Sequence, residues 1–170
     1  EAAGLGRAWL AAHPWHNYVV LKQAWALRES DSFPEETVTL RSAVEKQPQD
    51  EELNYALLTN LIARKLYDEA AVFMAQCEKT GIASSRFFND WANSLNEQER
   101  FDHAEAGYRK ALELASENAT AAGNLISFLT VRDRTDAALE LALAWIERHP
   151  DHHYVRRQLA HVYYTVDVYP

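Results

Sequence analysis

The sequence has little of what builds disulfide-rich, loop-rich or membrane-spanning proteins. Its 170 residues include one cysteine, five glycines and five prolines. One cysteine excludes an internal disulfide framework but leaves both cytoplasm and periplasm open; of the two, the cytoplasm is favoured. No run of about 18 apolar residues occurs, so no membrane span is predicted. The first residues also lack the basic start and apolar core of a signal peptide.

Positive charge is scarce as well. The 17 lysines and arginines stand against 25 aspartates and glutamates, for a formal net charge of −8. Such a chain repels phosphate at long range, which disfavours nucleic acid as a partner. The few tight basic pairs, such as Arg132 with Arg134 and Arg156 with Arg157, are interpreted as solvated charges at helix ends. The remainder is the composition of an ordinary globular domain, 48% hydrophobic and 25% charged.

Motifs for catalysis and for metal binding are missing. No glycine-rich phosphate loop, nucleophile elbow or zinc-ligand spacing appears. The densest histidine cluster lies around a proline turn and is interpreted as turn and groove-lining residues: His149, His152, His153 and His161. Cys77 is interpreted as an inert thiol in the core. The sequence therefore predicts a protein that is not an enzyme and has no metal site and no cofactor.

The stretch from Ser85 to Asn118 has a pattern that recurs along the chain. Its first half carries apolar residues at helical spacing, and its second half carries another apolar face: Phe88, Trp91 and Leu95, then Phe101, Ala104, Tyr108, Ala111 and Leu112. Ala104, near the start of the second half, has counterparts 34 residues before and 34 residues after it, Ala70 and Ala138. Pro14, Pro48 and Pro150 also lie at multiples of 34. This period indicates stacked helix–turn–helix units.

These residues resemble the tetratricopeptide repeat family along essentially the whole chain. The resemblance implies an all-α fold, a right-handed superhelical solenoid of antiparallel helix pairs with about ten helices. It implies a single solenoid domain, 1–170, divided into a partial unit, four repeats and a second partial unit: 1–16, 17–50, 51–84, 85–118, 119–152 and 153–170. Because the chain starts and stops inside units, we expect it to be a fragment of a longer array.

Two positions depart from the family pattern. Glu36 stands where the family has a small alanine at the helix crossing, which puts the packing of the unit from Asn17 in question. Trp145 stands where alanine is preferred on a second helix.

A polar stripe is the main indication of function. Asn89, Asn93 and Asn96 follow the helix face opposite the apolar stripe, where poor helix formers do not serve the core. Their amides can donate to, and accept from, the backbone of an extended peptide. The resemblance implies that this face lines a concave groove that binds peptides or partner proteins. Steps of one repeat along the chain add further candidate groove residues: Trp25, Tyr55, Asn124, Ser127, Arg157 and His161.

The sequence thus predicts a non-catalytic scaffold that binds a peptide or a partner protein in this groove. The alternative is an assembly or regulatory module of a larger bacterial secretion, polysaccharide-export or glycosyltransferase protein, in which the groove would also suit a polysaccharide. A third hypothesis is self-association through open terminal helices, with Trp9, Tyr163 and Tyr164 as contacts. The groove lacks the lysines of the family subgroup that clamps the C-terminal carboxylates of chaperones.

Overall fold

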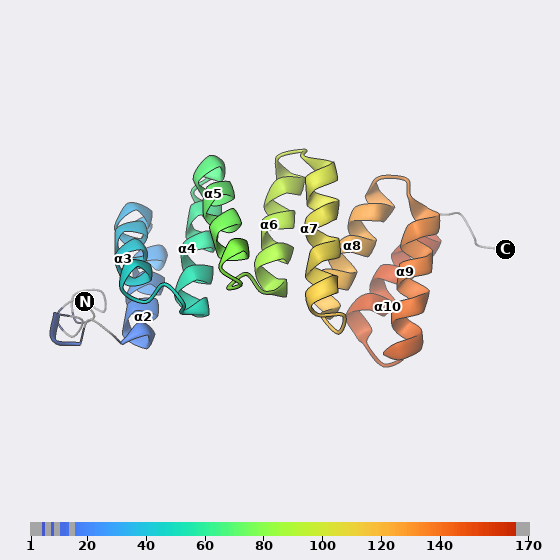
Figure 1. Ribbon diagram of the computed structural model, residues 1–170. Helices are drawn as coiled ribbons and strands as arrows, with labels where there is room; N and C mark the ends of the chain where they lie inside the picture. Colours follow the sequence, from blue (N-terminus) through green and yellow to red (C-terminus); the bar gives the residue numbers. More distant parts are fainter. Residues whose placement is uncertain (1–4, 6–7, 9–10, 14–15, 166–170) are drawn as a thin grey trace. The chain divides into compact units, whose positions relative to one another are not determined.

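The computed structural model describes residues 5, 8, 11–13 and 16–165. Within them the chain is helical and contains no strand (Figure 1). The helices are α2 (Asn17–Glu29), α3 (Phe33–Lys46), α4 (Glu51–Ala63), α5 (Tyr67–Lys79), α6 (Ser85–Glu97), α7 (Phe101–Leu114), α8 (Ala119–Val131), α9 (Thr135–Arg148) and α10 (His153–Thr165). Most of the predicted partial unit 1–16, including Trp9, lies outside the described residues.

Alternate helices begin at a constant interval. The helices α2, α4, α6, α8 and α10 start at Asn17, Glu51, Ser85, Ala119 and His153, a constant step of 34 in the numbering. The period of the sequence is therefore the period of the helices, and the predicted all-α helical repeat is confirmed. That the whole of 1–170 forms one domain stays a prediction.

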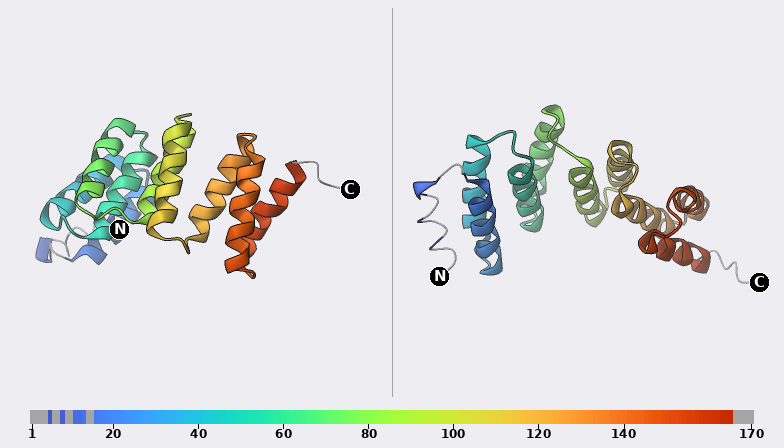
Figure 2. Two further views of the ribbon diagram at one scale, coloured as in Figure 1. Left: turned by 45° about the vertical axis from the view of Figure 1, so that its right-hand side comes forward. Right: turned by 90° about the horizontal axis from the view of Figure 1, so that it is seen from below.

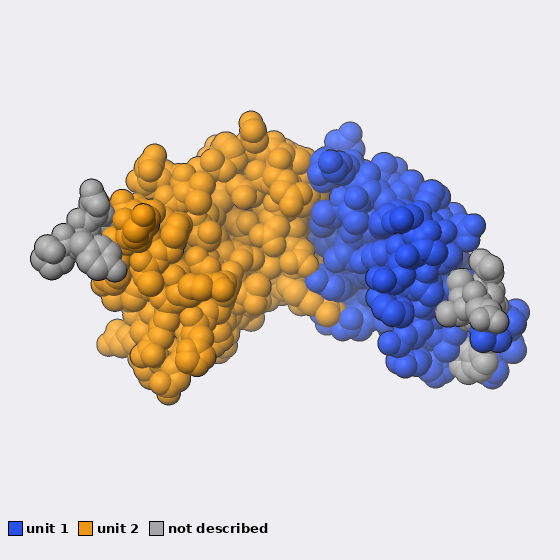
Figure 3. Space-filling model, turned by 180° about the vertical axis from the view of Figure 1, so that it is seen from behind, with its two compact units in different colours: residues 1–83 blue, residues 84–170 orange. Residues whose placement is uncertain are grey.

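The helices group into two compact units, residues 1–83 and 84–170 (Figure 3). In the first unit, α2 packs on α3, α3 on α4, and α4 on α5. In the second unit, α6 packs on α7, and α8 contacts α7, α9 and α10 (Figure 2). Within each unit, neighbouring helices thus cover one another's apolar faces, because no single amphipathic helix can bury its own.

The turn inside each helix pair has the same geometry in all four pairs. One residue of each turn has a left-handed backbone, with φ between 56° and 60°: Asp31, Lys65, Glu99 and Asp133. The next N–H donates to the carbonyl five residues back at 2.8–3.0 Å, on Leu27, Leu61, Leu95 and Leu129. This is a Schellman closure, which normally favours glycine. Gly81, which follows the C-terminal end of α5, also has a left-handed backbone, with φ of 74°.

The crossing of the two helices holds alanine in three of the four described pairs. Ala70, Ala104 and Ala138 occupy it and are completely buried. Glu36 takes the same position in the first pair with its side chain 2% exposed, and Arg28 Nη2 donates to its Oε1 at 2.6 Å. The question about packing in this unit is thereby answered, because an ion pair replaces the alanine and α2 still packs on α3.

Trp145, the second departure, is accommodated by the ends of neighbouring helices. Its side chain is buried, and its Nε1 donates to the carbonyl of Ser116 at 3.3 Å. The indole also lies against His149, with ring centroids 4.2 Å apart. The indole therefore fills the space at a position where the family prefers alanine, and its one polar atom, Nε1, has a hydrogen-bond acceptor.

Candidate functional site

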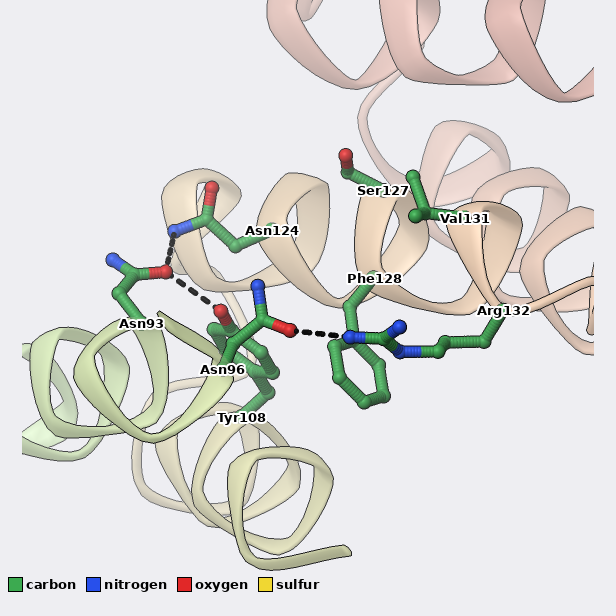
Figure 4. A pocket seen from close by; sticks show the side chains of 8 residues that line it. All are labelled: Asn93, Asn96, Tyr108, Asn124, Ser127, Phe128, Val131 and Arg132. Carbon is green, nitrogen blue, oxygen red and sulfur yellow. Dashed lines mark hydrogen bonds between the residues drawn. The ribbon is translucent and has the colours of Figure 1, made fainter. Parts of the chain in front are cut away.

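A pocket of about 200 Å³ opens on the second unit between α6, α7 and α8 (Figure 4). Its lining residues are Asn93, Asn96, Tyr108, Asn124, Ser127, Phe128, Val131 and Arg132. Four of them are among the predicted groove residues: Asn93, Asn96, Asn124 and Ser127. The repeat brings them together, because α6 and α8 are equivalent helices of consecutive pairs that contact each other.

Two aromatic rings form the apolar part of the pocket. The ring centroids of Tyr108 and Phe128 lie 5.6 Å apart, and both side chains are buried. The Arg132 guanidinium lies 5.4 Å from the Phe128 centroid and 3.2 Å from that of Phe101. Stacking on the two rings fixes the direction of the guanidinium and keeps its charge at the pocket edge.

The amide oxygens of α6 at the pocket already accept internal hydrogen bonds. The Tyr108 hydroxyl donates to Asn93 Oδ1 at 2.7 Å, and Arg132 Nη2 donates to Asn96 Oδ1 at 2.9 Å (Figure 4). Because arginine can only donate, the oxygen of Asn96 must face Arg132 and its nitrogen must face away. The Asn96 amide is thereby held in one orientation, and the Asn93 oxygen faces the Tyr108 hydroxyl.

Asn124 joins three helices at the edge of the pocket. Its Nδ2 donates to Asn89 Oδ1 at 2.9 Å and to Asn93 Oδ1 at 3.4 Å, so that α8 is tied to α6. Its Oδ1 accepts from the Tyr154 hydroxyl of α10 at 2.9 Å. The Tyr154 ring reaches this position by lying over Gly123, where a Cβ would come within 2.7 Å of its Cδ1. The polar groups of Asn124 are therefore used within the fold.

The groups left without a partner are donors. The nitrogens of Asn93 and Asn96 and the hydroxyl of Ser127 make no hydrogen bond with any described residue. The pocket therefore offers N–H donors, supplemented by one hydroxyl, beside an apolar surface. The sequence-based prediction that the amides both donate and accept stays a prediction, since the Asn96 oxygen accepts one internal hydrogen bond and keeps a second lone pair.

Charges of both signs lie around the pocket. Burial raises the pKa of Tyr108 to about 12, and the carboxylates of Glu97 and Asp90, with Tyr154, add to the rise. The hydroxyl thus remains a donor to Asn93 at neutral pH. The same carboxylates repel an incoming anion and offset the attraction of Arg132.

We expect Tyr108 to titrate later than an ordinary tyrosine. Its raised pKa means that the stability from its protonated form is complete below about pH 10 and is lost as the pH rises toward 12. Tyrosinate absorbance in the near ultraviolet should show a component near pH 12 in the wild type, and Tyr108→Phe should remove that component alone. A wild-type titration without a late component would contradict this assignment.

Asn89 differs from the predicted exposed stripe. Its side chain is only 4% exposed, and its Nδ2 donates to Asp90 Oδ1 at 3.0 Å while its oxygen accepts from Asn124. Asn89 therefore supports the orientation of Asn124 and does not line the pocket. The reason is that α8 packs against this part of α6.

The other predicted groove residues lie away from this pocket. In the first unit Trp25 is 60% exposed on α2, and Tyr55 is half-buried on α4. Arg157 and His161 are exposed on α10, where the Arg157 guanidinium lies 5.2 Å from the Tyr154 ring centroid. Their part in binding stays a prediction.

Sequence reasoning missed four residues of the pocket: Tyr108, Phe128, Val131 and Arg132. Tyr108 and Phe128 belong to the apolar pattern of their helices, and Arg132 was interpreted as a solvated charge. A usable signal exists for Arg132, which follows Asn96 by about one repeat and so falls near the same end of the equivalent helix. Nothing in the sequence indicates that Tyr108 directs its hydroxyl to an asparagine of the preceding helix.

Cys77 has the environment of an inert thiol, as the sequence predicts. Its side chain is 2% exposed, its Sγ lies 3.8 Å from Asn54 Oδ1, and burial raises its pKa to about 11. We expect Ellman's reagent at pH 8 to modify the native chain at least about 100-fold more slowly than the unfolded chain, since the thiolate is the reacting form. Equal rates with and without urea would contradict this expectation.

The described part of the chain holds neither a metal cluster nor a membrane-spanning helix. No group of three or more histidine, cysteine, aspartate or glutamate side chains there is arranged to hold a metal ion. No helix among the described residues combines the length and hydrophobicity that crossing a bilayer requires.

Solved structures with the same arrangement of helices identify the fold. YrrB, described as a tetratricopeptide repeat protein with an unusual peptide-binding site, matches with a TM-score of 0.65 at 16% identity, over 97% of this chain and 85% of that chain. TTC0263 from Thermus thermophilus matches with a TM-score of 0.71 at 15% identity, over 94% and 88%. The chain has the tetratricopeptide repeat fold.

Two other comparisons complete this result. PilF of Pseudomonas aeruginosa matches with a TM-score of 0.67 at 17% identity, over 86% of this chain and 67% of that chain. No family model and no curated protein matches the sequence. At these identities the structural likeness shows the fold, so the function of this tetratricopeptide repeat chain depends on its own site.

Proposed function

We propose that this tetratricopeptide repeat chain is a non-catalytic scaffold that binds an extended segment of a partner protein, and that the pocket of the second unit holds backbone carbonyls of that segment. The observation that carries the proposal is the orientation of the Asn93 and Asn96 amides toward internal donors. Their oxygens accept from Tyr108 and Arg132, so their nitrogens are left to donate to a ligand.

The neutral carbonyl of a peptide suits the pocket better than a carboxylate does. Glu97 and Asp90 are close enough to raise the pKa of Tyr108, and they would also repel an anionic group. The rings of Tyr108 and Phe128 offer an apolar contact for a side chain next to the bound carbonyls. The peptide-binding site described for YrrB, a protein of the same fold, is consistent with a peptide ligand.

The first unit offers a different kind of contact on α2. Tyr18 and Trp25 are each 60% exposed, and the ammonium of Lys22 lies 5.5 Å and 5.9 Å from their ring centroids. Exposed aromatic rings with a cation between them suit the side chains of a peptide better than its backbone. Trp25, predicted from the sequence as a groove residue, therefore keeps a place in this proposal.

The test uses isosteric variants of the two donors. Peptides would be selected from a random displayed library on the wild-type chain, synthesised, and measured by calorimetry. Asn93→Asp and Asn96→Asp keep one oxygen for the internal donor but replace the free N–H₂ with an acceptor, so each should weaken binding at least about 10-fold. Gln49→Glu, at an exposed position in the turn before α4, makes the same change of charge away from the pocket and should leave affinity unchanged.

Each outcome has a definite meaning. A loss of affinity in the Asn93 and Asn96 variants but not in Gln49→Glu would support binding by the donors of the pocket. Peptides that bind all four proteins equally would contradict the assignment, as would a selection that yields no peptide above background.

A further inference from the structure

A second pocket lies on the first unit, outside the groove predicted from the sequence. It has a volume of about 390 Å³ and is bounded by α3, α4 and α5. Leu57 and Leu61 are the lining residues of α4 and are themselves 3% and 2% exposed. Val72 and Phe73 of α5 add further apolar surface, and Val72 is 73% exposed. A pocket of this size and lining can take one large side chain.

The same helix positions form a related pocket one repeat earlier. Its volume is about 330 Å³, and five of its lining residues are the one-repeat-earlier equivalents of Leu57, Leu61, Glu69, Val72 and Phe73: Gln23, Leu27, Glu35, Val38 and Thr39. The pocket is thus a product of the repeat geometry. In the later copy Leu57 stands in place of a glutamine and Phe73 in place of a threonine, while Asp68 stands in place of Pro34.

Polar groups at the rim determine the charge that the pocket favours. Arg41 of α3 and Glu69 of α5 form an ion pair, so their charges compensate each other. Asp68 is exposed and has no ion-pair partner among the described residues. The uncompensated charge at the rim is therefore negative, and it lies beside an apolar surface.

We propose that this pocket is a docking site for a partner segment that places an aromatic or large aliphatic side chain next to a lysine or arginine. The apolar side chain would rest on Leu57, Leu61 and Phe73, and the basic group would face Asp68. The argument for this occupant is charge complementarity at the rim together with the size of the pocket. The site is independent of the second-unit pocket, since it shares no residue with it.

The first test measures the charge preference with three capped dipeptides: Ac-Trp-Lys-NH₂, Ac-Trp-Glu-NH₂ and Ac-Ser-Lys-NH₂. Each is titrated into the ¹⁵N-labelled full chain, and amide shifts are followed by NMR. Ac-Trp-Lys-NH₂ should give saturable shifts centred on Leu57, Leu61 and Phe73, with an affinity at least about 3-fold above Ac-Trp-Glu-NH₂. Ac-Ser-Lys-NH₂ should give none there. Equal affinity for the lysine and glutamate peptides, or shifts centred elsewhere, would overturn the proposal.

The second test uses surface variants that leave the core intact. Val72→Ser removes part of the apolar wall and should weaken Ac-Trp-Lys-NH₂ about 3-fold. Asp68→Asn should remove the preference for lysine over glutamate. Val38→Ser is the matched control, because Val38 is 68% exposed at the equivalent position of α3 and does not line this pocket. Unchanged binding in both Val72→Ser and Asp68→Asn would overturn the proposal.

Discussion

Replacing Arg28 with alanine is expected to destabilise the first unit by about 2–4 kcal/mol, because it leaves the buried carboxylate of Glu36 without its ion-pair partner. The carboxylate of Glu36 is buried between α2 and α3, and Arg28 supplies its hydrogen bonds at 2.6 Å and 3.0 Å. Removal of the guanidinium would leave that carboxylate without a partner, which costs several kcal/mol. The expected loss is smaller than for a fully buried ion pair, because Arg28 itself is 36% exposed and water can take the place of its guanidinium.

Removal of the other partner of the ion pair, by Glu36→Ala, should reduce the free energy of unfolding much less than Arg28→Ala does. Alanine occupies the equivalent crossing position in the other three helix pairs, at Ala70, Ala104 and Ala138. The double variant should therefore be more stable than Arg28→Ala alone. Urea unfolding combined with hydrogen exchange of the α2 and α3 amides measures this cycle. If Arg28→Ala and the double variant were equally destabilised, the loss would not come from the stranded carboxylate.

The second large effect is expected at Gly123. Alanine normally stabilises a helix by about 1 kcal/mol relative to glycine. At this position, however, a Cβ would lie 2.7 Å from Cδ1 and 2.9 Å from Cζ of Tyr154. The ring must move and lose its hydrogen bond to Asn124, so we expect Gly123→Ala to destabilise the packing of α10 on α8 by about 1–3 kcal/mol.

Whether Gly123→Ala raises or lowers stability should depend on the presence of the Tyr154 ring. In a Tyr154→Ala chain the space above residue 123 is open, so Gly123→Ala should there be neutral or stabilising, as helix propensity alone predicts. Hydrogen exchange of the α10 amides, together with the melting temperature, would report both effects. A destabilisation of equal size in both backgrounds would show that Tyr154 is not its cause.

The repeat fold is predictable from this sequence because its signal is periodic. Leucine recurs at Leu27, Leu61, Leu95 and Leu129, and each copy is 1–3% exposed in the core. The turn conformation could not be predicted in the same way. It uses Asp31, Lys65, Glu99 and Asp133 in a left-handed backbone that usually indicates glycine.

The candidate site is predictable only in part, for a different physical reason. The period places Asn93, Asn96, Asn124 and Ser127 on equivalent helices, and these residues do line one pocket. The roles of their polar atoms depend on donors from other helices, such as Tyr108 and Tyr154. Helical periodicity carries no information about such side-chain pairs, so the burial of Asn89 and the stacking of Arg132 were not foreseen.

We propose that the free amide nitrogens of Asn93 and Asn96 donate to a bound peptide. This donation is tested most directly by the side-chain N–H₂ resonances of the ¹⁵N-labelled chain, titrated with a peptide selected as described above. We predict that the Asn93 and Asn96 resonances move downfield to saturation, while those of Asn124 move less because its N–H₂ already donates to Asn89 and Asn93. Saturation of the peptide signal with unmoved Asn93 and Asn96 side-chain resonances would contradict donation by these two amides.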